Sequence, residues 1–369
     1  MDASLLTSAA FWTDSASPVP DVPALAGHVL FETSGSTGEP KWVALSKPAL
    51  LASAAAVNRH LQVSQESCWG LALPLNHVGG FGVAARAYEA GCGFQNFSQR
   101  WDAQVFREWL ERQEITHTSL VPTQVHDLVR AELTAPAALL TVVVGGGHLD
   151  RLTGQAARDL GWPVLASYGM TEAGSQIATQ GFEALQVPYQ PAPIPLLPIW
   201  EARISPNGVL AISGPALFAG YLSAGKFFPR ESARHTTSDR VILENRWLTP
   251  LGRGDALVKI LGELVDPAAI ERELLAISGG ALIAGTVAVI AIPDERAGHR
   301  LIPVFESSVS PALIASVLSG YQAQAPGFRR LGTAAVLGKF PRSGLGKLRR
   351  SELAALYQQS LTAHHAPPA

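Results

Sequence analysis

The sequence predicts an α/β protein with a large N-terminal α/β domain over residues 1–254 and a small, mobile C-terminal α+β domain over 255–369. Three observations carry this prediction. Short apolar runs alternate with helix-like stretches between residues 28 and 170, as expected for parallel strands joined by helices. Residues 186–250 are richer in proline and in short strands, which predicts a small β subdomain. Beyond residue 254 helical and strand patterns resume, which predicts the second domain.

The N-terminal domain starts with 26 residues rich in proline and alanine, which we expect to be partly irregular. The strands expected from apolar and β-branched runs are 28–32, 68–73, 139–147 and 162–169. The helices expected from amphipathic spacing or a glycine-rich start are 48–61, a helix from about 78, and 102–113.

The β subdomain is expected to contain a strand at 208–213. In the C-terminal domain we expect two helices, one of which has proline in its first turn, and two strands. The helices are 267–278 and 311–321, and the strands are 285–294 and 300–306. The last six residues, HHAPPA, are expected to be disordered.

Composition narrows the class of protein. The 369 residues are 47% hydrophobic and 16% charged, which indicates a globular chain with a large core. The net charge of −2 argues against nucleic acid or an anionic membrane as the general partner. The two cysteines form no CxxC pair or disulfide framework, which favours a reducing compartment. We find no signal peptide and no apolar run of about 18 residues, so we expect a cytoplasmic protein without a membrane span.

The stretch TSGSTGEPK at 33–41 follows an expected strand. Backbone N–H groups in such a loop can converge on an anion, the hydroxyl groups add donors, and Lys41 adds a positive charge. It is not the Walker pattern, because the lysine lies three residues beyond Gly38 and no serine or threonine follows it. A flexible surface loop is the alternative.

Two further stretches follow expected strands and so should lie at the carboxyl edge of the sheet, where α/β proteins bind ligands. PLNHVGGFG at 74–82 places His77 there, with a structural histidine as the alternative. In SYGMTEAG, Tyr168 offers a flat face for a base, Thr171 a hydroxyl and Glu172 a hard oxygen ligand for Mg²⁺. The alternative for Glu172 is a solvated loop acid.

Three later residues carry candidate chemistry. Asp239 in TTSD can accept hydrogen bonds from two ribose hydroxyls, and Arg253 in GRGD can donate to them. We reject cell adhesion for the RGD tripeptide, because it occurs by chance and no secretion signal accompanies it. Lys347 lies in FPRSGLGKLRR at 340–350, a glycine-containing loop expected to be mobile. The alternatives for this loop are a solvated basic face or a weak nucleic-acid patch.

Taken together and in this order, these stretches resemble the acyl-adenylate-forming superfamily of acyl-CoA synthetases, peptide-synthetase adenylation domains and luciferases. The resemblance runs from about residue 28 to 352, and SGPALFAGY at 213–221 matches a further motif of the superfamily. It implies the adenylate-forming enzyme fold, in which the C-terminal domain is a lid that moves about a hinge at Asp255. It also implies ATP, Mg²⁺ and coenzyme A as the molecules used with a carboxylic acid.

The resemblance assigns roles to individual residues. The catalytic residues it implies are Lys347, Thr171, Glu172 and His77, with Glu172 holding the metal. The ATP-binding residues it implies, from the phosphate loop to the adenine and ribose contacts, are Thr33, Ser34, Gly35, Ser36, Thr37, Gly38, Lys41, Gly146, Tyr168, Thr171, Asp239 and Arg253. The candidates for the acyl pocket are His77, Gly80, Ser119, Pro122, Thr123 and the loop that begins with Gly145.

Within the superfamily, HTSLVPTQVHDLVR at 117–130 is similar to a stretch of the o-succinylbenzoate–CoA ligases of menaquinone synthesis. The favoured acid is therefore o-succinylbenzoate. The alternatives are another aryl- or acyl-CoA synthetase, or a non-catalytic nucleotide-binding homologue. A homodimer is left open.

The chain departs from the pattern of the superfamily in two places. Only 32 residues precede the phosphate loop, which implies a shortened N-terminal subdomain and puts the outer wall of the acyl site in doubt. TTSD stands where the superfamily more often has TGD, although the aspartate is retained.

Overall fold

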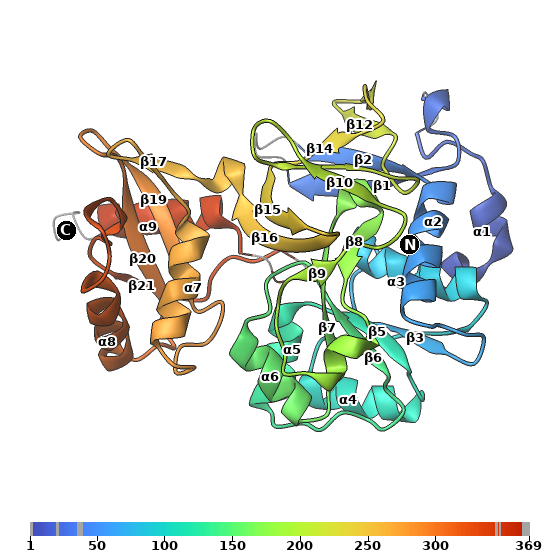
Figure 1. Ribbon diagram of the computed structural model, residues 1–369, viewed down its shortest axis with the longest axis horizontal. Coiled ribbons are helices and arrows are strands. Elements are labelled where there is room, and N and C mark those ends of the chain that lie inside the picture. The colour runs from blue at the N-terminus through green and yellow to red at the C-terminus, as the bar shows by residue number, and fades with distance from the viewer. Residues whose placement is uncertain (1–2, 20–21, 35–39, 344–345, 347, 364–369) are drawn as a thin grey trace. The chain divides into compact units, whose positions relative to one another are not determined.

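The computed structural model describes residues 3–19, 22–34, 40–343, 346 and 348–363. The chain forms two compact units, each with its own hydrophobic core (Figure 1). The first unit is Met1–Thr237 with Val241–Pro250, and the second is Ser238–Arg240 with Leu251–Ala369.

The first unit is built around a six-stranded sheet with the order β4-β3-β5-β6-β7-β8. Its strands are β3 (Cys68–Leu71), β4 (Gly93–Asn96), β5 (His117–Leu120), β6 (Thr141–Val144), β7 (Val164–Met170) and β8 (Ser175–Thr179). Neighbours from β4 to β7 are parallel, and β8 runs antiparallel to β7. The α/β sheet predicted from apolar runs is therefore confirmed, and those runs are continuous because both faces of the sheet are covered.

Five helices accompany this sheet. They are α2 (Lys47–His60), α3 (Val78–Ala90), α4 (Ala103–Arg112), α5 (Pro122–Arg130) and α6 (Arg151–Asp159). Helices α2 and α3 pack on each other on one side of the sheet, and α4 to α6 lie together on the other (Figure 1). Three of them begin where a side chain accepts a backbone hydrogen bond, at Ser46, Asp102 and Asp150.

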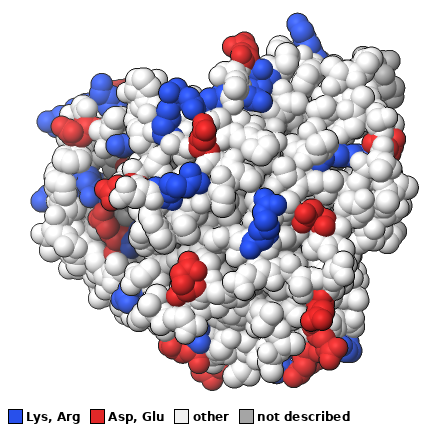
Figure 2. Space-filling model, turned by 45° about the vertical axis from the view of Figure 1, so that its right-hand side comes forward, with Lys and Arg blue, Asp and Glu red and all other residues white. Residues whose placement is uncertain are grey.

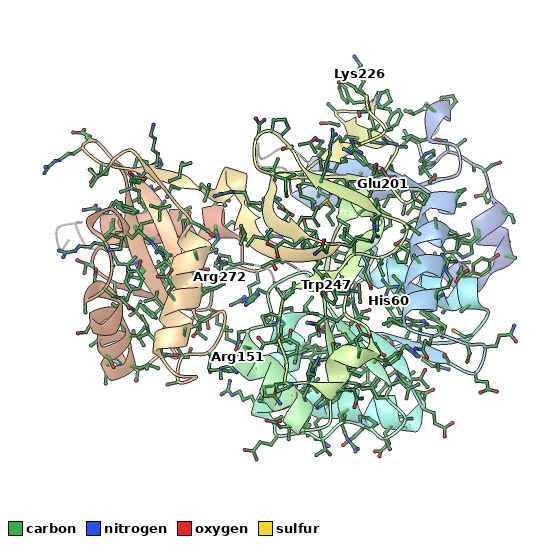
Figure 3. The ribbon with its side chains drawn as sticks, viewed as in Figure 1. His60, Arg151, Glu201, Lys226, Trp247 and Arg272 are labelled. Atoms are coloured by element: carbon green, nitrogen blue, oxygen red, sulfur yellow. The ribbon has the colours of Figure 1, made fainter. Side chains whose placement is uncertain are left out.

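The strand predicted at 28–32 exists as β1 (His28–Ser34), but it does not belong to the parallel sheet. It pairs antiparallel with β2 (Pro40–Ser46) in a separate sheet of order β1-β2-β12-β13, with β12 (Gly220–Ser223) and β13 (Lys226–Pro229). The prediction of a parallel strand was wrong because an apolar run indicates a strand but not its partner. Lys226 begins β13 and projects from the unit (Figure 3).

Smaller β elements complete this part of the chain. Strands β10 (Glu201–Ile204), β11 (Leu210–Ser213) and β14 (His235–Thr236) form one sheet, which contains the strand predicted at 208–213. Strands β15 (Asp239–Glu244), β16 (Trp247–Arg253) and β9 (Ile194–Pro195) form another. The short 3₁₀ turns of the first unit beyond its N-terminal segment are η3 (Thr171–Ala173) and η4 (Phe182–Gln186).

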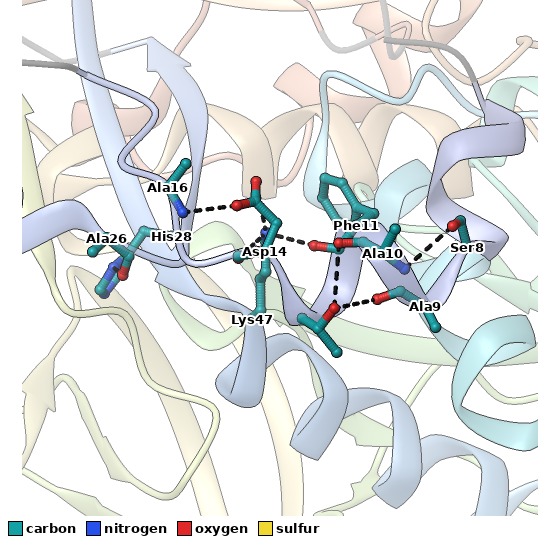
Figure 4. Close-up of polar contacts among 10 residues, drawn as sticks. Ser8, Ala9, Ala10, Phe11, Asp14, Ala16, Ala26, His28 and Lys47 are labelled. Atoms are coloured by element: carbon teal, nitrogen blue, oxygen red, sulfur yellow. Dashed lines mark hydrogen bonds and ion pairs between the residues drawn. The ribbon is translucent and has the colours of Figure 1, made fainter.

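The N-terminal segment is more regular than its composition predicts, with η1 (Ala3–Thr7), α1 (Ala9–Thr13) and η2 (Pro23–Leu25). Lys47, on α2, is only 6% exposed, and its ammonium donates hydrogen bonds of 2.6 Å to the carbonyls of Phe11 and Asp14 (Figure 4). The ring of Trp12 stacks on Tyr88 of α3, with 5.3 Å between ring centroids. These contacts hold the N-terminal segment against α2 and α3.

The second unit has a sheet of order β19-β20-β21 and a hairpin of β17 and β18. Its elements are η5 (Gly254–Ala256), β17 (Val258–Ile260), β18 (Glu263–Val265), α7 (Pro267–Ile277), β19 (Val287–Asp294), β20 (Gly298–Glu306), α8 (Pro311–Gln322), η6 (Gly327–Arg329), β21 (Ala335–Leu337) and α9 (Arg350–Ala363). The two predicted helices and two predicted strands are confirmed within a few residues. The tail expected to be disordered lies outside the described residues.

No helix within the described ranges has the length and apolar character to cross a bilayer. On the face shown in Figure 2, positive and negative side chains are interspersed among uncharged ones.

Candidate functional site

The parallel strands bring several predicted site residues to one edge of the sheet. The carboxyl ends of β3, β5, β6 and β7 lead into the stretches that contain His77, Thr123, Gly145 and Thr171. Because parallel neighbours end at the same edge, the predicted acyl-pocket and nucleotide residues of the first unit converge there.

Tyr168 lies within β7, in agreement with the strand predicted at 162–169, and it is half-buried and packs against the main core. Strand β7 extends past its parallel partner β6 and continues by pairing antiparallel with β8 over residues 167–170. The next residue, Gly169, has no room for a side chain, since an added Cβ would lie 1.7 Å from the Ser175 carbonyl oxygen. Close pairing of β7 and β8 thus fixes the backbone beside Tyr168.

Glu172 lies in the η3 turn that follows β7, with Thr171 before it. Its backbone carbonyl accepts a 2.9 Å hydrogen bond from the Phe218 N–H, and its Oε1 accepts a 3.0 Å hydrogen bond from the Tyr221 hydroxyl. Burial and the neighbouring Glu172 charge both raise the pKa of Tyr221, so this phenol stays protonated and remains a donor. Glu172 is therefore an oriented carboxylate and not a loop acid that contacts only solvent.

Lys41 reaches the same tyrosine from β2. Its ammonium lies 3.2 Å from the centroid of the Tyr221 ring, a cation–π contact. Opposite it on β1, the Thr33 hydroxyl donates a 3.0 Å hydrogen bond to the Lys41 carbonyl. Of the other predicted phosphate-loop residues, 35–39 lie outside the described residues, and only the backbone of Ser34 is described.

The Glu172 carboxylate is a suitable ligand for a Mg²⁺ ion that also binds the phosphates of a substrate. In the part of the chain that the structure describes, no three His, Cys, Asp or Glu side chains gather into a metal site. Mg²⁺ usually keeps several waters and binds through one or two carboxylates plus substrate phosphates. A single oriented carboxylate at Glu172 fits this chemistry.

His77 is the N-cap of α3 and is half-buried. Burial lowers its pKa, and the charge of Glu32 on β1 opposes that effect in part, so the imidazole is neutral near pH 7. Gly80, one turn into α3, sits against the preceding turn, where an added Cβ would lie 2.3 Å from the Pro74 carbonyl oxygen. Packing alone accounts for this glycine, and its role in the acyl pocket stays a prediction.

The remaining acyl-pocket candidates lie on β5 and its neighbours. Ser119 is buried on β5, and Thr123 is half-buried in the first turn of α5 behind Pro122. The Gly145 N–H donates a 3.2 Å hydrogen bond to the carbonyl at the end of β5, and Gly146 adopts a φ of +74° that favours glycine.

Arg86 was missed by the sequence analysis. It lies on α3, is 2% exposed, and donates hydrogen bonds to the hydroxyls of Ser119 (3.2 Å) and Ser175 (3.4 Å). Its guanidinium carbon lies 5.1 Å from the Trp69 ring centroid. Among the described residues, no carboxylate lies within ion-pair distance of it, and burial lowers its pKa to about 9. A lone arginine in the small and apolar run GGFGVAARAYEAG was the available signal.

The predicted ribose-binding residues lie in the second unit. Asp239 begins β15 and Arg253 ends the neighbouring strand β16, and the Gly254 N–H donates a 2.6 Å hydrogen bond to the Ser238 carbonyl. The two residues are thus brought to the same end of one hairpin. Asp255, the predicted hinge, lies in η5, and its side chain is not described.

Lys347 lies outside the described residues, but the chain on either side of it is held firmly. Arg342 donates a 3.0 Å hydrogen bond to the Gly346 carbonyl and forms a β-bridge with Leu348. Arg350 pairs with Glu271 of α7, with 2.7 Å between Nη2 and Oε2. The ends of the predicted lysine loop are therefore fixed, and the role of the lysine stays a prediction.

Comparisons with known proteins agree with this geometry. Residues 6–222 match the model of a family described as AMP-binding enzyme. A 2-succinylbenzoate–CoA ligase of Bacillus thuringiensis subsp. konkukian (strain 97-27) is 27% identical over 341 residues, which are 89% of this chain and 69% of that protein.

Among solved structures, o-succinylbenzoate CoA synthetase from Bacillus subtilis is similar in two complexes. With the acyl-adenylate intermediate OSB-AMP it gives a TM-score of 0.72 at 25% identity, over 88% of this chain and 68% of that one. With ATP and a magnesium ion it gives a TM-score of 0.73 at 25% identity, over 88% and 69%.

Proposed function

The chain belongs to the AMP-binding enzyme family, and from this we propose that it is an ATP-dependent acid–CoA ligase whose acid is o-succinylbenzoate. In the first step a carboxylate oxygen of the acid would attack the α-phosphorus of ATP, and pyrophosphate would leave. In the second step the sulfur of coenzyme A would attack the acyl carbonyl, and AMP would leave with the electrons of the broken C–O bond. The similarity of this chain to ligases of this acid, over most of its length, supports the proposal.

The first step joins two anions, so its barrier is largely electrostatic. Lys41 would lower the repulsion by lying beside the phosphates, and Glu172 would hold Mg²⁺ with Thr171 next to it. When bound, Mg²⁺ neutralises charge on the phosphate oxygens. His77, neutral near pH 7, would border the acyl group without adding a charge there.

We propose that Tyr168 and Gly146 contact adenine, and that Asp239 and Arg253 bind the ribose hydroxyls. Lys347 would stabilise the negative charge that develops on the α-phosphate. Rotation of the C-terminal domain about Asp255 would then remove this lysine and admit the thiol.

The choice of o-succinylbenzoate as the acid rests on the buried side chain of Arg86. Burying a cation without a counter-charge is unfavourable, and no described carboxylate compensates this one. o-Succinylbenzoate has two carboxylates, of which only one is activated. We propose that the second is stabilised by Arg86 and by the Ser119 hydroxyl beside it.

The test is pyrophosphate release by the purified protein with ATP, Mg²⁺ and o-succinylbenzoate, with and without coenzyme A, and with mass detection of the thioester. Pyrophosphate release that depends on o-succinylbenzoate supports the proposal. Preference for benzoate or a fatty acid would refute the choice of acid but keep the chemistry. ATP binding without release for any acid would favour a non-catalytic homologue.

A pair of lysine variants tests the mechanism. Lys347→Ala is expected to abolish adenylate formation, whereas Lys226→Ala, at the tip of the β12–β13 hairpin, should leave it unchanged. Equal activity of the two variants would refute the assignment of Lys347. We further propose a cytoplasmic location. A homodimer remains compatible with the proposal, and size-exclusion chromatography with light scattering would detect it.

A further inference from the structure

We propose that Tyr221 is a positioning residue that holds Lys41 and Glu172 in the orientations required for Mg²⁺ and the ATP phosphates. The inference rests on the proposed function, and it adds a residue that the sequence analysis placed only in a structural motif. Its side chain contacts both groups, one through the ring and the other through the hydroxyl.

Tyr221 is itself fixed by its surroundings. It lies on β12 opposite Val43 of β2, two residues from Lys41, so Tyr221 and Lys41 lie on the same face of the sheet. Its ring packs on Phe218 with 4.7 Å between centroids, and Phe218 is 2% exposed. The N–H of Phe218 also binds the Glu172 carbonyl. The tyrosine and the η3 turn are therefore held to the same short segment of chain.

The hydroxyl has one function in this arrangement. Its hydrogen bond of 3.0 Å to Oε1 restricts rotation of the Glu172 carboxylate and leaves Oε2 for another partner. Hydrogen bonds from groups behind a metal ligand commonly change metal affinity by about 10- to 100-fold. Removing the hydroxyl alone should therefore weaken the response to Mg²⁺ and leave the ring contact intact.

The ring has a separate function. Lys41 has a long, flexible side chain, and the aromatic face limits where its ammonium can lie. A cation–π contact of this kind changes an equilibrium by about 2- to 30-fold. Removing the ring should loosen Lys41 and weaken the binding of ATP even when Mg²⁺ is absent.

Two variants separate these functions. Tyr221→Phe removes only the hydroxyl, and Tyr221→Leu also removes the ring. Tyr88→Phe is the matched control, because Tyr88 is also half-buried and its ring stacks on Trp12. Isothermal titration calorimetry measures ATP affinity in EDTA and at rising Mg²⁺, and circular dichroism confirms that each variant is folded.

For Tyr221→Phe we expect an unchanged ATP dissociation constant in EDTA and a roughly tenfold higher Mg²⁺ concentration at half-saturation. For Tyr221→Leu we expect, in addition, an ATP dissociation constant in EDTA that is about threefold higher or more. The inference is overturned if Tyr221→Phe matches the wild type and Tyr88→Phe in its Mg²⁺ response. Binding of ATP is measured without an acid, so failure of the proposed acid specificity leaves this test intact.

Discussion

Replacing Arg86 by methionine should stabilise the protein and at the same time weaken its binding of a dicarboxylic acid. Arg86 is buried between Ser119 and Ser175, without a carboxylate partner among the described residues. Methionine is similar in length, apolar and adaptable, so it can fill the same space. The variant thus removes a buried charge without leaving a large cavity.

The magnitude follows from the contacts. Burial lowers the pKa of Arg86 to about 9, which is equivalent to a folding penalty of about 5 kcal/mol. Against this, the variant loses two long hydrogen bonds, worth about 0.5–1 kcal/mol each, and a contact with the Trp69 ring worth about 1 kcal/mol. We expect a net increase of about 2 kcal/mol in the free energy of unfolding, within the range found when buried ionic groups are replaced by apolar ones.

Urea unfolding at pH 7 measures this difference. Arg86 is charged in both the folded and the unfolded chain at this pH, so the full penalty of burying the charge is present.

The acid is titrated in parallel by calorimetry. Affinity for o-succinylbenzoate should fall by about tenfold or more, whereas a monocarboxylate such as benzoate should be nearly unaffected. Destabilisation of the variant by more than about 1 kcal/mol would refute the account of the buried charge. Unchanged affinity for the dicarboxylate would refute the assignment of Arg86 to the acid.

Three further predictions concern stability. Lys47→Met leaves two carbonyls of the N-terminal segment without their charged donor, so we expect a loss of about 2–3 kcal/mol and earlier cleavage of that segment in limited proteolysis. Gly80→Ala places a Cβ 2.3 Å from the Pro74 carbonyl oxygen and should cost about 2 kcal/mol or more in urea unfolding. The control Gly79→Ala has its nearest neighbour at 3.7 Å and should be tolerated. Arg350→Gln breaks the ion pair with α7 and should cost about 2 kcal/mol in the unfolding of the second unit, measured by urea unfolding.

The sequence allowed most of the fold to be predicted, because continuous apolar runs mark buried parallel strands. The strands at 68–73, 139–147 and 162–169 are examples. The same signal gave the wrong sheet for residues 28–32, since apolar content does not identify a pairing partner. Strand β2 was not predicted at all, because Pro40 and Lys41 were interpreted as the end of a loop.

The candidate site was predictable to the extent that its residues lie in contiguous motifs. His77, Thr171 and Glu172 were proposed because each follows a predicted strand, and their roles stay predictions. Arg86 and Tyr221 were not, because burial of a charge and contact between strands β2 and β12 depend on packing between segments far apart in the chain.

The division of the chain into two units affects how hybrid proteins should be built. Ser238–Arg240 cluster with the second unit although Val241–Pro250 return to the first, so the chain passes between the units three times. A gene fusion at Asp255, the hinge predicted from the sequence, would transplant a lid without residues 238–240 and 251–254, which belong to the second unit. Exchange of lids between related ligases should instead carry residues 238–240 along with everything from 251 onward, so that all residues of the second unit come from the same parent.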